Sequence, residues 1–262
     1  MKDLADAQYE ERRSADNLNN LAGSFGLKLS LGQRATMEGH AVYGLALILP
    51  FIASDKGGTF PRVTTGIIIV NTVLFFYVGY DHLLWKTFGL TPLDFWREQD
   101  WSLLLSSQYL HGGILHLLGN SYFLWMFGKN VERRLKPLLF LAVYTTSGIV
   151  AGLVHATAFS KSDITMIGAS GAISGIMGAF FVLFPGAVIR SLFFGQVFQV
   201  HIVFYLFTWI LFSLVYAFQS NIAGAGHGGI AWDAHIGGFL AGILLMHLFR
   251  IRSSSRFQLN PT

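Results

Sequence analysis

Three short stretches, far apart in the chain, carry side chains that could together cleave an acyl bond. In the first, Ser170 stands between Gly168 and Gly171 at the start of an apolar segment. Glycines lack a β-carbon, so another chain can approach the hydroxyl closely. The start of a helix also offers unpaired N–H groups that favour an oxyanion. Small residues at this spacing equally serve to pack membrane helices together, and this stretch alone leaves both interpretations open.

The second stretch places His235 inside another apolar segment, followed by Gly238 and Gly242. An ionisable side chain within a membrane segment is costly and needs a reason. The two glycines form a small face that allows close helix packing. If that face meets the glycines after Ser170, the imidazole can take the proton of the hydroxyl. The alternative is a buried histidine bonded to a carbonyl.

The third stretch carries His116 and Asn120, which share one helix face because they are four residues apart. Both can donate hydrogen bonds to a developing oxyanion, together with the N–H of Ser170. An interhelical hydrogen bond is the alternative use of these side chains. A metal site of His111, His116 and His235 is also open, but no HExxH motif supports it. We therefore expect no metal and no cofactor.

The composition indicates a membrane protein. Of 262 residues, 53% are hydrophobic and 12% are charged, about half the charged fraction of soluble domains. The apolar residues gather in long runs, which predicts a polytopic helical protein embedded in the lipid bilayer. The net charge of +4 is modest and gives no reason to expect a nucleic-acid partner. The chain has no cysteine, which excludes disulfides and thiolate chemistry.

Six membrane spans are expected between a polar N-terminal extension and a short polar tail. They are residues 63–80, 113–131, 137–156, 168–184, 197–218 and 231–251. The mixture of charges and tryptophans in residues 81–112 predicts a loop structured at the membrane interface. An apolar run at 41–54 is shorter than the ~20 residues of a spanning helix. We expect that run to lie in the interface or to dock on the bundle as a helix.

Basic residues fix the expected orientation. They gather after the second, fourth and sixth spans, whereas residues 157–167 hold one lysine and 219–230 no charge. The basic residues in question are Lys129, Arg133, Arg134, Lys136, Arg190, Arg250, Arg252 and Arg256. The positive-inside rule then places both termini in the cytoplasm. With that topology Ser170 and His235 both lie just below the outer membrane surface.

Taken together, these stretches resemble the rhomboid family of intramembrane serine proteases. The resemblance covers about residues 60–251 and keeps the order of the family's motifs. The motifs are His116-Leu-Leu-Gly-Asn120, Gly168-Ala-Ser170-Gly171 and Ala234-His235-Ile-Gly-Gly238 with Gly242. The stretches Gly128-Lys-Asn-Val-Glu132-Arg-Arg134 and His111-Gly112-Gly113 are similar too. The implied fold is an all-α, rhomboid-like bundle of six transmembrane helices at 61–251, with an N-terminal cytoplasmic extension at 1–60 and a tail at 252–262.

The resemblance implies that Ser170 is a nucleophile, His235 its base, and His116, Asn120 and the Ser170 amide an oxyanion site. It implies hydrolysis of peptide bonds in membrane-anchored protein substrates. The residues themselves favour a dyad, because Asp233 is two positions before His235 and points to another side of a helix. A catalytically silent rhomboid-like protein that binds membrane clients is the alternative. The short, compact form of the chain favours a protein of the bacterial inner membrane.

Two positions depart from patterns found in the family. The pair Trp101-Ser102 stands where some members carry Trp-Arg, while Trp96-Arg97 comes several residues earlier, which leaves open how this loop is held. Some members place a tyrosine under the histidine, one turn after the serine; here that position is Ser174. Gln219–Ile230 is rich in glycine and is expected to be either a movable cap or a plain connector. His155 and His227 are interpreted as ordinary packing or interfacial histidines.

Overall fold

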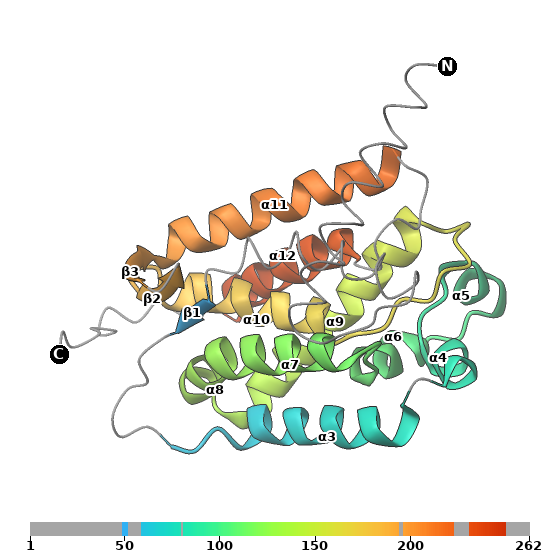
Figure 1. Ribbon diagram of the computed structural model, residues 1–262, viewed down its shortest axis with the longest axis horizontal. Helices are drawn as coiled ribbons and strands as arrows, with labels where there is room; N and C mark the ends of the chain where they lie inside the picture. The colour runs from blue at the N-terminus through green and yellow to red at the C-terminus, as the bar shows by residue number, and fades with distance from the viewer. Residues whose placement is uncertain (1–48, 52–58, 80, 194–195, 223–230, 250–262) are drawn as a thin grey trace, which may run out of the picture. The chain divides into compact units, whose positions relative to one another are not determined.

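The computed structural model describes residues 49–51, 59–79, 81–193, 196–222 and 231–249. Contacts divide the chain into residues 1–49 and 50–262, and the helices among the described residues belong to the second unit. It is mostly helical (Figure 1). The helical elements are α3 (Arg62–Val78), α4 (His82–Phe88), α5 (Pro92–Glu98), α6 (Leu103–Ser106), η1 (Ser107–Tyr109), α7 (Ile114–Phe123), η2 (Leu124–Gly128), α8 (Lys129–Leu135), α9 (Pro137–Ala158), α10 (Ser170–Leu183), α11 (Ile202–Ile222) and α12 (Trp232–Leu248).

Each predicted span coincides with a helical stretch, although the lengths differ. The second span consists of α7, the π-helix η2 and α8 in immediate succession. Within the described residues, one helix, α9, is long and apolar enough to cross a membrane, with a mean hydropathy of 1.8 over its best window. The shorter apolar helices are Arg62–Val78, Ser170–Leu183, Ile202–Val215 and Trp232–Leu248.

The expectation of an all-helical chain is wrong in two places. A hairpin of β2 (Val188–Phe193) and β3 (Gln196–His201) precedes α11, with Ile189 opposite Val200 in antiparallel register. The predicted fifth span therefore begins at Ile202 and not at residue 197. The sequence places residues 197–201 in the span because they lead directly into the apolar helix, and so short a run shows no period that separates a strand from a helix.

Strand β1 (Leu49–Phe51) lies inside the run where an interfacial helix is expected, so that prediction is wrong for these three residues. Proline at position 50 disfavours helix there, because it restricts the residue before it to extended backbone. Residues 41–48 and 52–54 of the run lie outside the described residues. So do residues 223–230 of the glycine-rich loop, with His227 among them, while α11 continues through the loop's first residues to Ile222.

Helices α9, α10 and α12 pack through glycines, and we call their contact the glycine seam. A β-carbon on Gly238 would fall on the carbonyl oxygen of Gly171, and one on Gly242 on that of Gly175. The third helix joins at Gly175, where a β-carbon would strike Ser147 of α9. Figure 1 shows α10 and α12 side by side, with α9 against them. The prediction that the glycines after Ser170 meet those after His235 is confirmed.

A single carboxylate fixes the start of α3. Glu132 accepts hydrogen bonds from the backbone N–H of Val63 at 2.9 Å and from the N–H and hydroxyl of Thr64 at 2.8 and 2.7 Å. Glu132 is 3% exposed, so these bonds form away from solvent. The carboxylate satisfies first-turn donors and faces the positive end of the helix dipole. The similarity around Gly128–Arg134 thus corresponds to a helix cap.

The segment between α3 and α7 is structured, as predicted, and it is tied to the chain that leads into α10. Leu90 and Met166 exchange backbone hydrogen bonds at 2.9 and 2.8 Å. The indole N–H of Trp96 donates to the carbonyl oxygen of Ala156 at 2.7 Å, at the end of α9. Trp96, and not Trp101, therefore anchors this loop. These bonds hold residues 162–168 in place ahead of Ser170.

Candidate active site

Ser170 is the first residue of α10, and it comes two residues after a glycine with an unusual backbone conformation. Gly168 adopts φ +135°, a conformation that residues with a side chain rarely take. Its N–H donates to the carbonyl oxygen of Ser107 at 2.9 Å. The residue at the N-cap, Ala169, supplies no side-chain acceptor to the first turn. The first-turn amides next to the Ser170 hydroxyl are thus left without a side-chain cap.

His116 and Asn120 of α7 lie directly beside this turn. A β-carbon on Gly168 would sit 2.8 Å from Cε1 and Nε2 of His116 and 3.8 Å from Nδ2 of Asn120. Asn120 is 9% exposed, and its Nδ2 donates to no acceptor within the described part of the chain. A buried amide donor without a partner carries a desolvation cost that a bound oxyanion would relieve.

His235 lies in the first turn of α12, and the start of that helix touches the start of α10. A β-carbon on Gly171, next to Ser170, would be 3.8 Å from the carbonyl oxygen of Ala234, next to His235. The imidazole is 9% exposed, and Nδ1 has no hydrogen-bond partner among the described residues. Its neighbours are aromatic: Trp209 stacks on the ring and Trp232 meets it edge-on.

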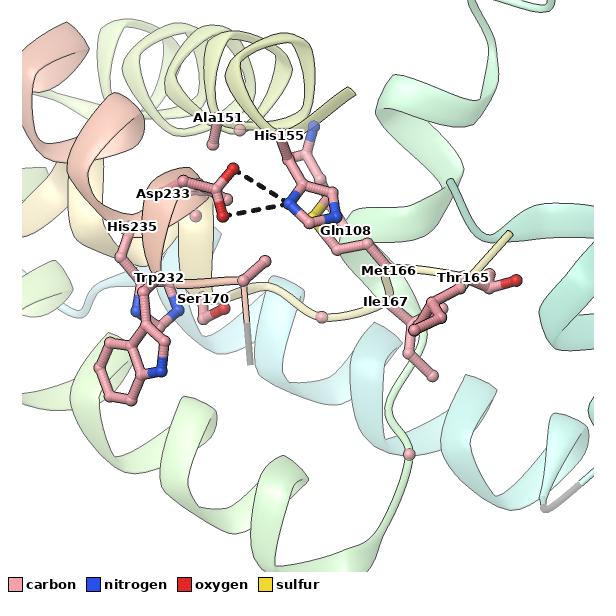
Figure 2. A pocket seen from close by; sticks show the side chains of 18 of the residues that line it. Gln108, Ala151, His155, Thr165, Met166, Ile167, Ser170, Trp232, Asp233 and His235 are labelled. Carbon is pink, nitrogen blue, oxygen red and sulfur yellow. Dashed lines mark hydrogen bonds and ion pairs between the residues drawn. The ribbon is translucent and has the colours of Figure 1, made fainter. Parts of the chain in front are cut away.

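One pocket of about 380 Å³ brings the four predicted site residues together, because Ser170, His235, His116 and Asn120 all line it. Figure 2 shows the side chains of Ser170 and His235 directed toward the same part of the pocket, next to Trp232. No hydrogen bond joins Ser170 to His235 in this structure. For proton transfer the two groups must approach each other inside a cavity that both already line. Catalytic hydrogen bonds are often long without substrate and shorten when substrate binds.

Asp233 and His155 are hydrogen-bonded to each other across the same pocket, which corrects the interpretation of His155 as an ordinary packing residue. Nδ1 of His155 lies 3.1 and 3.0 Å from the two carboxylate oxygens of Asp233, and both side chains are 13% exposed. Figure 2 shows the pair opposite Ser170 and His235. The pair joins the last turn of α9 to the first turn of α12, where the carboxylate of Asp233 suits the positive end of the helix dipole.

His111 is the fourth histidine in this region, and its ring centroid lies 5.2 Å from that of His116. Burial, with a smaller contribution from His116, lowers the pKa of His111 to about 3, so the ring is neutral at physiological pH. Within the described residues, no three His, Asp or Glu side chains gather as metal ligands would. The arrangement of His111 and His116 is therefore one of two packed rings beside the pocket.

Comparison with known proteins assigns this fold. A profile of the Rhomboid domain matches residues 94–252, a stretch that contains all four site residues. The chain belongs to the rhomboid family. This is a family of intramembrane proteases. The motif resemblance seen in the sequence is thereby confirmed at the level of the family.

Relatives from a bacterium and a plant carry rhomboid names. The chain is 29% identical over 221 residues to "Putative rhomboid protease YdcA" of Bacillus subtilis (strain 168), a match that covers 79% of this chain and 100% of that protein. It is 34% identical over 160 residues to "Rhomboid protease GluP" of the same bacterium, covering 60% of this chain and 29% of GluP. It is 31% identical over 155 residues to "RHOMBOID-like protein 4" of Arabidopsis thaliana, covering 59% and 35%. The chain therefore spans YdcA fully but only about a third of the other two rhomboid relatives.

Proposed function

We propose that this protein is an intramembrane serine protease that hydrolyses peptide bonds in or near the membrane segments of anchored proteins. The observation that carries the proposal is one pocket, at the start of two tightly packed helices, that holds a serine, a histidine, a buried amide donor and a half-buried imidazole donor. A hydroxyl nucleophile, an imidazole base and N–H donors are the groups that acyl transfer requires. Membership of a protease family supports the same conclusion.

In the proposed reaction the Ser170 hydroxyl oxygen attacks the carbonyl carbon of the scissile peptide while the His235 imidazole takes its proton. The carbonyl oxygen becomes an oxyanion. Asn120, His116 and the Ser170 amide donate hydrogen bonds to it, and these bonds strengthen as the charge develops. The imidazolium then returns the proton to the leaving amine, and an acyl ester remains on Ser170. Water hydrolyses that ester with His235 again as base.

We infer a dyad and not a triad. A third group that orients the base would have to be a carboxylate near His235, and Asp233 is the acidic side chain nearest in sequence. Its two oxygens are engaged by His155, on the other side of the pocket. No hydrogen bond therefore joins the carboxylate to Nδ1 of the imidazole.

The proposal includes the topology on which the chemistry depends. Six spans between residues 61 and 251, an N-terminal extension at 1–60 and a tail at 252–262, with both ends in the cytoplasm, would set the pocket near the outer surface. Large apolar side chains that face outward support contact with lipid, since a soluble protein would bury them. Examples are Phe76 at 73%, Tyr77 at 81%, Leu115 at 67% and Phe204 at 65% exposed. The bacterial relatives favour a bacterial plasma membrane.

The test is cleavage of a model transmembrane substrate by the full chain in liposomes. Ser170→Ala should lower kcat at least about 10³-fold, and His235→Ala should do the same, because the two groups act as a unit. Ser174→Ala is the matched control: its hydroxyl donates to the Ser170 carbonyl oxygen at 2.7 Å and should be dispensable for cleavage. A fluorophosphonate should label the wild type and the control but neither dyad variant.

Cleavage that persists in Ser170→Ala would remove the proposed function. Wild-type protein that folds and binds the substrate without cutting it would instead favour the rhomboid-like client-binding protein.

A further inference from the structure

The base of the proposed dyad is held by ring packing rather than by hydrogen bonds. Nδ1 of His235 has no hydrogen-bond partner among the described residues. The turn after Ser170 offers no ring beneath it, because Ser174 is small and its hydroxyl is engaged with the Ser170 carbonyl oxygen. The terminal torsion of a histidine is broad, so an imidazole without hydrogen bonds needs packing to fix its plane.

Two indoles supply that packing, in different ways. The ring of Trp209 lies 5.9 Å from the imidazole, centroid to centroid, with an interplanar angle of 25°, which is a stacked arrangement. Trp232 approaches at 5.3 Å with an angle of 80°, edge to face. At this separation the rings are offset-stacked, so the indole lies against part of the imidazole face and resists tilting of its plane, whereas an edge contact limits it along one line. Trp209 is therefore the larger restraint on the plane of the base.

We infer that Trp209, on α11, is the positioning residue that orients the His235 imidazole toward Ser170. The inference rests on the proposed function and names a residue outside the three predicted site stretches. Trp209 is itself supported from α12: its ring lies 5.9 Å from that of Phe239 at 45°, and Phe239 is one turn after His235. His235 and Phe239 thus place two rings of one helix face against a single indole, and this fixes the indole between them.

This arrangement links the base to a third helix. Ser170 is on α10 and His235 on α12, which are joined by the glycine seam, but the plane of the imidazole depends on α11. The indole face also favours the imidazolium that forms when His235 takes the proton, because a cation within about 6 Å of an indole face is attracted to it. Trp209 would therefore act on the chemical step and leave substrate binding unaffected.

The experiment compares Trp209→Leu with Trp209→Phe in the full chain, in liposomes, against the same transmembrane substrate. Leucine fills part of the space without a flat face, and phenylalanine keeps a face. We expect kcat to fall about 10- to 100-fold in the leucine variant with KM within about twofold, and to fall less than about fivefold in the phenylalanine variant. The rate of fluorophosphonate labelling should fall in parallel with kcat. Phe207→Leu, on the same helix at a side chain that is 61% exposed, should match the wild type.

The outcomes separate the inference from the proposed function. A leucine variant with wild-type kcat, measured beside an inactive Ser170→Ala, would overturn the role of Trp209 and leave the protease assignment intact. Equal loss in the leucine and phenylalanine variants would also overturn it, because retention by an aromatic ring is the distinguishing result. If wild type and Ser170→Ala cleave alike, the proposed function fails first. Should Trp209→Leu not fold, judged by its melting temperature, Trp209→Met takes its place with the same expectation.

Discussion

The two proposed catalytic side chains are held by opposite kinds of contact. On the side of Ser170, α10 meets α12 backbone to backbone and meets α9 through the small side chains of Ser147 and Ala151, and the glycine seam leaves no room for a β-carbon. On the side of His235, α11 meets α12 through large rings, those of Trp209, His235 and Phe239. Backbone contacts cannot be adjusted by a change of rotamer, but ring contacts can. The nucleophile should thus be fixed by the fold itself, and the base by side-chain packing that single substitutions can loosen.

The largest expected effect comes from opening the glycine seam. In Gly242→Ala the new β-carbon would fall on the carbonyl oxygen of Gly175, so α10 and α12 must separate. We expect a loss of about 1–3 kcal/mol in the free energy of unfolding, more than the helix propensity of alanine returns, with loss of cleavage. Thermal unfolding in detergent together with the cleavage assay measures both effects.

Gly66→Ala on α3 is the matched control, because nothing lies within 4 Å of its β-carbon position. It should leave both the melting temperature and cleavage at wild-type values or raise stability slightly. Equal behaviour of the two variants would contradict the view that the glycine seam is a close backbone contact.

A middle-sized effect is expected at the outer end of the glycine seam, where His155 and Asp233 join α9 to α12. Asp233→Asn removes the charge but keeps an oxygen that can accept from Nδ1 of His155. We expect a loss of about 1–2 kcal/mol of stability and a decrease in kcat of less than about tenfold. A decrease comparable with that of His235→Ala would mean that Asp233 belongs to the catalytic group, in contradiction to a dyad.

His247→Gln is the control for this change, since His247 lies at the other end of α12 and contacts the Ile243 carbonyl oxygen at 2.8 Å. It should leave kcat unchanged. Melting curves of both variants show whether the pair at the pocket stabilises the fold more than a histidine contact far from it.

The contrast between backbone contacts and ring contacts also explains which parts of this site could be predicted from the sequence. Glycines four residues apart and polar side chains at one depth are local patterns, so the meeting of the Ser170 and His235 helices could be expected. The pairing of His155 with Asp233 and of Trp209 with His235 could not, because each joins helices whose relative rotation no local spacing determines. The β2–β3 hairpin escaped prediction because each six-residue strand mixes apolar and polar side chains without a regular alternation, so neither shows the period of a strand.

The smallest expected effect tests the ring contacts without touching Trp209. Phe239 lies between two rings, Trp209 of α11 at 5.9 Å and Phe181 of α10 at 6.3 Å. Phe239→Leu removes both contacts, while Phe181→Leu removes only the one on the α10 side. Each lost ring pair should cost about 0.5–1.5 kcal/mol, so both variants should melt within a few degrees of each other. If rings from α11 orient the base, kcat should fall about two- to fivefold in Phe239→Leu and stay at the wild-type value in Phe181→Leu, because only the first leaves the Trp209 indole free to tilt. Equal kcat values in the two variants would mean that α11 contributes only packing. The ring contacts would then stabilise the fold without orienting the base.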